Sequence, residues 1–325
     1  MSVHPEARPT LRVAFFGTPR FAVPTLEHLL RSRHTVAGVV TQPDRPRGRG
    51  QRHSDAPVKQ VALGARLPIL QPERMQDISL LETLRGWQLD LGVVVAYGRI
   101  LPSTLLELPR LGMINAHASL LPKYRGAAPI QRAVMAGERE TGVTIIRIVQ
   151  ALDSGPILGA ATRPIDPDEN AEQVEEDLSF LGAALVMSAI DDLAAGKMED
   201  TLQDDAQATY APRLTKAEGV IDWTNTAQRI HNQIRGLYPW PHAFTYLDGA
   251  RYILLESRVP SNITDSSHAR TGEILRASGD DLTVRAGDAA LDVLKIQPEG
   301  RRPFHIREFL AGHTLSPGQV FGGPD

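Results

Sequence analysis

Hydrophobic positions over the first 195 residues fall into short continuous runs and helix-spaced stripes that follow one another in turn. The runs at 11–19, 35–41 and 90–98 are bounded by Gly, Pro or polar residues and are typical of buried parallel strands. Between the first two, the apolar residues of 21–31 have a spacing close to that of a helix. Strand, helix and strand within about thirty residues indicate a βαβ unit. We therefore expect a Rossmann-like, doubly wound, mostly parallel α/β sheet.

The pattern changes towards the C-terminus. Further strands are predicted at 67–70, 113–119 and 143–149, and helices near 77–86 and from about 171 to 195. After a polar, acidic stretch come one helix near 226–235 and short β-like runs separated by turn residues, with Asp248-Gly249 as a hairpin signal. Short strands of this kind suggest a small, OB-like β-barrel. The domains that we expect are a catalytic domain over 1–195, a linker over 196–214 and the barrel over 215–325.

Composition narrows the class of protein. A length of 325 residues favours two domains, and the absence of cysteine excludes disulfides, thiolate metal sites and thiol nucleophiles. We expect no metal. No apolar run approaches 18 residues and the N-terminal segment has no apolar signal region, so we expect no membrane partner and a cytoplasmic protein. The absence of coiled-coil heptads favours a monomer.

Charge is unevenly distributed along the chain. The 35 basic and 38 acidic side chains give a net charge of −3, which taken alone disfavours a nucleic-acid partner. Residues 166–205, however, hold 13 acidic side chains and one basic one, a local charge of −12, and the rest of the chain therefore carries +9. The segment 44–53 is basic and contains two glycines; its arginines are Arg45, Arg47, Arg49 and Arg52. It is either a solvated loop or a basic loop that orders on RNA, because arginine suits phosphate and guanine contacts.

The segment 112–132 has the strongest signs of chemistry. Asn115 and His117 are two residues apart at the expected end of a strand, so their side chains share a face. Open α/β sheets bind ligands at the carboxyl ends of their strands. Asp153 follows a further predicted strand, and we expect it at the same edge. The first turn reads Gly17-Thr18-Pro19, without the glycine fingerprint of dinucleotide-binding folds.

Each of these polar residues has an ordinary structural interpretation on its own. Histidine is most often a satisfied core or surface residue, and Asn and Asp-Ser-Gly are common in turns. Together, however, they suit acyl transfer to an amine. An Asn amide can stabilise the oxyanion of a tetrahedral intermediate, an imidazole can accept the amine proton, and a carboxylate can orient the imidazole. The G-x-S-x-G motif of serine acyl-enzymes is absent.

The same segment resembles the signature of the folate-dependent formyltransferase family, in which Asn-x-His is followed by Ser-Leu-Leu-Pro and later by Leu-Asp-Ser-Gly. Within this family the chain is most similar to the tRNA formyltransferases. The matching blocks are FFGTPRFAVPTL at 15–26, TQPDRPRGRGQ at 41–51, VVVAYGRILP at 93–102, ETGVTIIRI at 140–148, IDW at 221–223 and GLYPWP at 236–241. One departure is Ala118, where many relatives have Gly; we expect it to tune the pocket without loss of activity.

The resemblance implies transfer of a formyl group from 10-formyltetrahydrofolate to the α-amine of initiator methionyl-tRNA. The catalytic residues would be Asn115, His117 and Asp153, with His117 as the base or as a second oxyanion donor. The residues lining the folate site would be Ser119, Leu120, Leu121, Pro122, Val95, Ala96 and Tyr97. By the same resemblance, 44–53 is the tRNA-binding loop, with Arg49 as its key contact.

Two other functions fit part of the pattern. A formyltransferase for a small amine, or a hydrolase of 10-formyltetrahydrofolate, would need the same three polar residues but not the basic loop. A non-catalytic RNA-binding protein of the same architecture would have no use for Asn115, His117 and Asp153 at one sheet edge.

Overall fold

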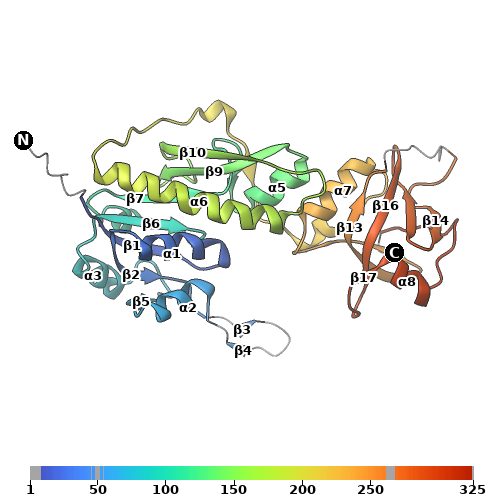
Figure 1. Cartoon of the computed structure of the whole chain (residues 1–325), viewed down its shortest axis with the longest axis horizontal. Coiled ribbons are helices and arrows are strands. Elements are labelled where there is room, and N and C mark those ends of the chain that lie inside the picture. Colours follow the sequence, from blue (N-terminus) through green and yellow to red (C-terminus); the bar gives the residue numbers. More distant parts are fainter. Residues whose placement is uncertain (1–8, 45, 48–51, 54, 261–267, 324–325) are drawn as a thin grey trace, which may run out of the picture. The chain divides into compact units, whose positions relative to one another are not determined.

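The computed structural model describes residues 9–44, 46–47, 52–53, 55–260 and 268–323 (Figure 1). The chain forms two compact units. The first contains 1–129, 141–163 and 175–211, and the second contains 130–140, 164–174 and 212–325. The chain passes into the second unit for the last time after Ala211, within the predicted linker. The domain boundaries drawn from the sequence stay a prediction.

A seven-stranded sheet forms the centre of the first unit, in the order β10-β9-β7-β6-β1-β2-β5. Its strands are β1 (Arg12–Gly17), β2 (Thr35–Val40), β5 (Ile69–Leu70), β6 (Leu91–Val95), β7 (Met113–His117), β9 (Glu140–Arg147) and β10 (Ile157–Pro164). The pairs β5–β2, β2–β1, β1–β6 and β6–β7 are parallel, whereas β7 and β9 are antiparallel. The expected mostly parallel α/β sheet is therefore confirmed.

Helices cover the sheet because its central strands are apolar on both faces. One face packs against α3 (Ile78–Gly86), where Ala14 and Phe16 share a core cluster with Leu80 and Leu84. The long helix α6 (Ala171–Ala194) crosses the near face in Figure 1. The first unit also contains α1 (Val23–Arg31), α2 (Pro57–Gly64) and α4 (Ser103–Leu106), with the 3-10 turn η1 (Arg20–Ala22).

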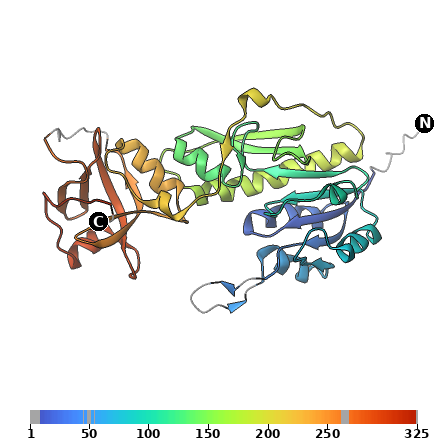
Figure 2. The same cartoon turned by 180° about the vertical axis from the view of Figure 1, so that it is seen from behind.

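Short strands and turns complete the first unit. The small pairs are β3 (Pro46–Arg47) with β4 (Arg52–His53), and β8 (Arg125–Gly126) with β11 (Tyr210–Ala211). Between α6 and β11 the chain includes the 3-10 turn η2 (Asp205–Gln207). Figure 2 shows this segment running back along the β9–β10 side of the sheet, where Thr201 bridges to Ile157.

The second unit contains an antiparallel sheet in the order β12-β13-β16-β15-β14, with β17 paired to β16. Its strands are β12 (Ala243–Leu247), β13 (Ala250–Arg258), β14 (Ile274–Ser278), β15 (Asp281–Arg285), β16 (Ala290–Pro298) and β17 (Phe304–His305). This unit also contains α7 (Ala227–Gly236) and α8 (Ile306–Gly312), the 3-10 turn η3 (Lys216–Gly219) and, from its 130–140 segment, most of α5 (Pro129–Ala136). The predicted hairpin is confirmed: Asp248 and Gly249 both have positive φ, as a two-residue turn between β12 and β13 requires.

The two edge strands of this sheet are joined by the C-terminal segment. Gly322 bridges to Tyr246 of β12, and Val320 bridges to Glu273 at the start of β14. Phe321 lies between them with its side chain in the core, 6.0 Å from the ring of Trp223. The sheet is thereby closed into a barrel, which leaves β12 and β14 without open edges there.

No helix in the described part of the chain is both long and apolar enough to cross a membrane.

Candidate active site

Asn115 and His117 lie on β7, at the edge where the parallel strands β6 and β7 end. Their spacing on one strand puts both side chains on the same face. His117 is buried, with 6% of its surface exposed, and Asn115 is half-buried. Within the described part of the chain, the Asn115 side chain has no hydrogen-bond partner, so its amide is free to donate to a ligand. The predicted pairing of an amide and an imidazole is thus present in the structure.

The two ring nitrogens of His117 have different neighbours. Nε2 lies 2.9 Å from the carbonyl oxygen of Tyr124, and Nδ1 lies 3.6 Å from Oδ2 of Asp153. A carbonyl oxygen can only accept, so Nε2 is the nitrogen that carries the hydrogen. In the neutral ring the lone pair is then on Nδ1, on the side of the carboxylate. This arrangement suits Nδ1 for accepting a proton.

Asp153 reaches His117 by a different path from the one that the sequence suggested. We expected it at the same edge because it follows a strand, but that reason is wrong: β9 is antiparallel to β7, and Arg147 at its end pairs with Ile114. The loop after β9 carries Asp153 back to His117. There its carboxylate accepts the backbone N–H of Gly126 at 2.9 Å, and its φ is +47°.

The segment 119–122 is built as a tight turn next to His117. The Ser119 hydroxyl donates to the carbonyl of Lys123 at 2.6 Å and its side chain is fully buried. Thr144 of β9 donates to the carbonyl of Ser119 and accepts from the N–H of Leu121, at 2.7 and 3.1 Å. The Ser119 hydroxyl therefore stabilises the turn. The folate-lining role of Ser119, Leu120, Leu121 and Pro122 stays a prediction.

The segment 95–97 begins with the last residue of β6, Val95, which pairs with Ala116 of β7. The ring of Tyr97 is buried against Phe16 at 5.7 Å, and burial raises the pKa of Tyr97 to about 12. Its carbonyl accepts from the side chain of Gln42 at 2.6 Å. Ala96 is exposed at this edge. Val95 and Tyr97 thus hold the turn, and contact of this segment with folate stays a prediction.

A group of residues that the sequence did not indicate supports the Asp153 loop. Arg125 is buried, with 4% of its surface exposed, and donates from Nε and Nη2 to Oε1 of Gln203 at 3.1 and 2.7 Å. It also forms an ion pair with Asp205 at 2.7 Å. Gln203 donates to the carbonyls of Asp153 and Gly155. Gln203 and Asp205 belong to the stretch predicted as a linker, where polar residues without periodicity carried no signal of a site.

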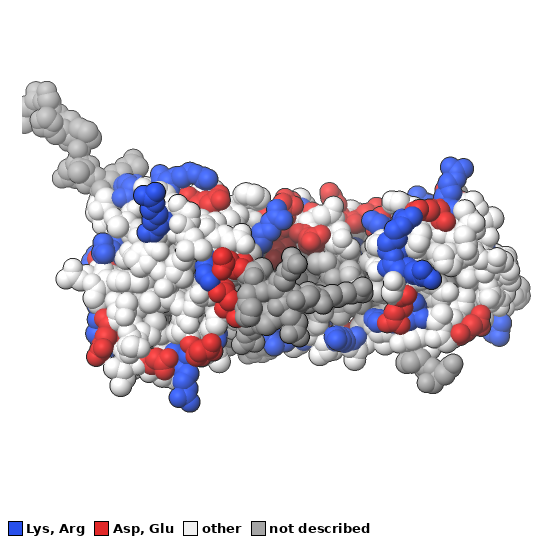
Figure 3. Space-filling model, turned by 90° about the horizontal axis from the view of Figure 1, so that it is seen from below, with Lys and Arg blue, Asp and Glu red and all other residues white. Residues whose placement is uncertain are grey.

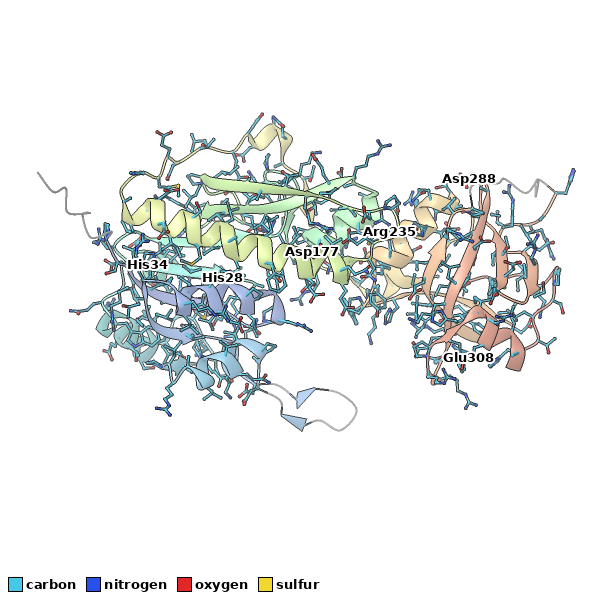
Figure 4. The ribbon with its side chains drawn as sticks, in the orientation of Figure 1. His28, His34, Asp177, Arg235, Asp288 and Glu308 are labelled. Atoms are coloured by element: carbon cyan, nitrogen blue, oxygen red, sulfur yellow. The ribbon has the colours of Figure 1, made fainter. Side chains whose placement is uncertain are left out.

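A second buried histidine among the described residues of this unit, His34, lies just before β2 (labelled in Figure 4). Its Nδ1 accepts from the N–H of Leu11 at 3.0 Å, and its Nε2 donates to Asp191 at 3.0 Å. Both nitrogens are therefore used to connect secondary-structure elements. His34 is a structural histidine, in contrast to His117.

The predicted tRNA-binding loop falls mostly outside what the structure describes. Arg45 and Arg49 lie outside the described residues, and for Arg47 and Arg52 the structure describes only the backbone, in the β3–β4 pair. On the described surface in Figure 3, basic and acidic side chains are interspersed. The assignment of these four arginines to tRNA stays a prediction.

In the described ranges there is no group of three or more His, Asp or Glu side chains placed to hold a metal ion.

Comparison with known proteins agrees with this geometry. Residues 11–190 match the family model described as formyl transferase, and residues 213–314 match the formyl transferase C-terminal domain. The chain is 45% identical to the methionyl-tRNA formyltransferase of Moorella thermoacetica over 313 residues, which are 96% of this chain and 99% of the relative. It is 44% identical to the enzyme of the same name from Citrifermentans bemidjiense over 315 residues, 97% of this chain and 98% of the relative.

Solved structures share the fold at low identity. WlaRD, a sugar 3N-formyl transferase studied in the presence of dTDP and 5-N-formyl-THF, is 17% identical, with a TM-score of 0.66 over 90% of this chain and 99% of that one. The N-formyltransferase from Helicobacter canadensis, in complex with folinic acid and dTDP-3-aminofucose, is 18% identical, with a TM-score of 0.67 over 89% and 99%. On its full-length sequence similarity, this chain belongs to the formyl transferase family and, within it, to the methionyl-tRNA formyltransferases.

Proposed function

We propose that this protein transfers the formyl group of 10-formyltetrahydrofolate to the α-amine of initiator methionyl-tRNA, for the initiation of translation. The observation that carries the proposal is the environment of His117, which lies on the same strand face as Asn115. Its Nε2 donates to the Tyr124 carbonyl, and its Nδ1 faces the Asp153 carboxylate. Full-length relatives named for this activity support the choice of substrates.

The reaction begins with attack of the free α-amine on the formyl carbon, which gives a tetrahedral intermediate with a negatively charged oxygen. The Asn115 amide donates a hydrogen bond to this oxygen, an interaction that strengthens as charge develops. As the new C–N bond forms, the amine becomes acidic and loses a proton. His117 is the base that accepts it at Nδ1, the nitrogen left unprotonated by the hydrogen bond to Tyr124.

Asp153 acts on the protonated ring. Its carboxylate lies 3.6 Å from Nδ1 and stabilises the positive charge that the imidazole acquires. The N–H of Gly126 holds the carboxylate in this position. The intermediate then collapses with cleavage of the bond to N10 of the folate, and a proton returns to N10. Formyl-methionyl-tRNA and tetrahydrofolate leave the site with protons and charge balanced.

On the RNA side, the arginines of 44–53 contact the acceptor end. Guanidinium groups bind phosphates in two-pronged hydrogen bonds, and a loop with two glycines can follow the shape of the RNA. The protein acts in the cytoplasm, where charged initiator tRNA is present, and as a monomer. These assignments are part of the proposal.

A direct assay tests the function. Purified protein is given 10-formyltetrahydrofolate with a labelled formyl group and either methionyl-tRNA, a small primary amine or water alone. We expect label in methionyl-tRNA, with a kcat/KM at least about 1,000-fold above that for the small amine. The small amine lacks the contacts that the rest of the tRNA makes with the enzyme, and enzymes lose kcat when such remote binding energy is removed. Equal rates with both acceptors, or release of labelled formate alone, would contradict the proposal.

A further inference from the structure

The segment 201–211 contacts both partners of His117. Gln203 binds the loop that carries Asp153, and Thr209 binds the backbone of Tyr124. We propose that Gln203 is a positioning residue of the formyl transfer reaction, which acts by holding Asp153 against His117. This inference rests on the proposed function for its kinetic test, but its structural test does not.

All the hydrogen-bonding capacity of the Gln203 amide is used in one orientation. Nε2 donates to the carbonyls of Asp153 and Gly155 at 2.9 and 2.7 Å, while Oε1 accepts two bonds from Arg125. A flipped amide would direct its oxygen at two carbonyls and its N–H groups at a guanidinium, so only one orientation satisfies every partner. The amide therefore connects a buried cation to the backbone of the catalytic loop.

The backbone of Asp153 requires such support. Its φ of +47° lies in the left-handed region, which residues other than glycine adopt only where their surroundings stabilise it. The Asp153 carbonyl is held by Gln203, and its carboxylate is held by the N–H of Gly126. Without the contact from Gln203, the loop loses one of the two restraints that keep the carboxylate facing Nδ1 of His117.

Two further contacts of the same segment hold the Tyr124 side of the ring. The Thr209 hydroxyl accepts from the N–H of Tyr124, and the Thr209 carbonyl accepts from the N–H of Arg125, both at 2.8 Å. The Ala211 carbonyl also packs closely against Gly126, since a Cβ atom added there would lie 2.7 Å from the carbonyl oxygen. Residues 201–211 therefore hold both neighbours of the His117 ring: the Tyr124 carbonyl at Nε2 and the Asp153 carboxylate at Nδ1.

The decisive variant is Gln203→Glu. The side chain keeps its size and its acceptor for Arg125, but the second oxygen of its carboxylate faces the carbonyls of Asp153 and Gly155 and cannot donate to them. We expect kcat to fall on the order of 10- to 100-fold, as for small displacements of a catalytic group, while KM for folate and for tRNA stays within about twofold. The matched control, Gln76→Glu, adds the same charge at an exposed side chain outside the segment 201–211 and should leave kcat within about twofold.

Coupling to Asp153 separates positioning from a general effect on folding. In an Asp153→Asn background, Gln203→Glu should lower kcat by less than about twofold further, because the carboxylate that it positions is already absent. If the fold-reductions in kcat of the two single variants multiply in the double variant, the proposal is wrong. It is also wrong if Gln203→Glu alone leaves kcat unchanged. If Gln203→Glu does not fold, Gln203→Met, which removes the donor without adding charge, takes its place in both measurements.

Amide hydrogen exchange gives a test that needs no substrate. In Gln203→Glu the amide of Gly126, which donates to the Asp153 carboxylate, should exchange at least about tenfold faster than in the wild type, while the amides of the central strand β6 stay unchanged. Unchanged exchange at Gly126 would contradict the inference even if methionyl-tRNA is the substrate. Conversely, faster exchange in a protein that does not formylate methionyl-tRNA would leave the inference standing and refute only the proposed function.

Discussion

The Nε2 nitrogen of His117 donates a hydrogen bond to the carbonyl oxygen of Tyr124 at 2.9 Å. Because that acceptor is a backbone oxygen, the bond selects one tautomer and leaves Nδ1 as the basic nitrogen of the neutral ring. From sequence alone, His117 was either a base or a second oxyanion donor. The hydrogen bond to Tyr124 favours the base, since a role as oxyanion donor through Nε2 would require that bond to break.

The first prediction follows from this hydrogen bond. Replacing His117 with Ala removes the proton acceptor, and we expect kcat for methionyl-tRNA to fall by about 10²- to 10⁴-fold, the usual contribution of general-base catalysis. Binding of tRNA, measured by filter retention, should stay within about twofold. His34→Ala is the matched control: it should lower the free energy of unfolding by about 1–3 kcal/mol, by leaving the Leu11 N–H without its acceptor, but leave kcat of the folded enzyme unchanged. Retained turnover in His117→Ala would remove His117 from the mechanism.

The second prediction concerns Asn115. Its amide is the candidate oxyanion donor, and loss of one such donor typically costs about 10²- to 10³-fold in kcat. We expect Asn115→Ala to lose kcat in this range while its dissociation constant for tetrahydrofolate, measured by calorimetry, changes by less than about threefold. A fall in folate affinity that accounts for the whole effect would instead place Asn115 in substrate binding alone.

The sequence pattern predicted some parts of this site and not others, for physical reasons. The shared face of Asn115 and His117 follows from the two-residue period of a strand, which does not depend on distant contacts. The meeting of His117 with Asp153 depends on the direction of β9, which apolar patterning does not encode, because buried parallel and antiparallel strands can have the same composition. The expected proximity was correct, but the reason for it was not.

The supporting residues were beyond the reach of the sequence pattern. Gln203 lies in a polar stretch without periodicity, and it contacts a loop 50 residues away in the chain. The segment 319–322, which joins β12 to β14, is too short to give a strand pattern. Both depend on long-range pairing that local propensities do not determine.

The third prediction tests the closure of the barrel by the C-terminal segment. Phe321 is 1% exposed and stacks on Trp223, whose indole N–H donates to Thr245. Replacing Phe321 with Ala should lower the free energy of unfolding by about 3–5 kcal/mol, the usual cost of emptying a core aromatic site. Urea unfolding followed by tryptophan fluorescence measures this. Leu202→Ala, at a side chain that is 81% exposed, is the control and should change stability by less than about 0.5 kcal/mol.

The fourth prediction concerns Arg49. If its guanidinium binds a tRNA phosphate, Arg49→Ala should raise KM for methionyl-tRNA and reduce by about one the slope of log affinity against log salt. KM for folate should not change, because Asn115 and His117 do not depend on the loop. Arg85→Ala, which removes an exposed arginine from α3, is the control for net charge. The same salt slope in both variants would mean that the loop acts only through overall charge.

The last prediction is a pH dependence of stability that originates at His231 on α7. Burial lowers the pKa of His231 below its ordinary value of 6.5, and its ring is satisfied in the neutral form, with Nε2 donating to the Pro167 carbonyl at 2.9 Å and Nδ1 accepting from Ser257 at 3.0 Å. The unfolded chain therefore binds a proton at a higher pH than the folded one, and the contribution of the neutral ring to stability is lost as the pH falls below about 6.5. His231→Gln should be less stable than the wild type at pH 8, with a difference that shrinks towards pH 5 in thermal unfolding. The control is His268→Gln, at an exposed position, whose difference in stability from the wild type should be the same at pH 8 and pH 5. If the difference for His231→Gln is also the same at both pH values, His231 is not the source of the acid sensitivity.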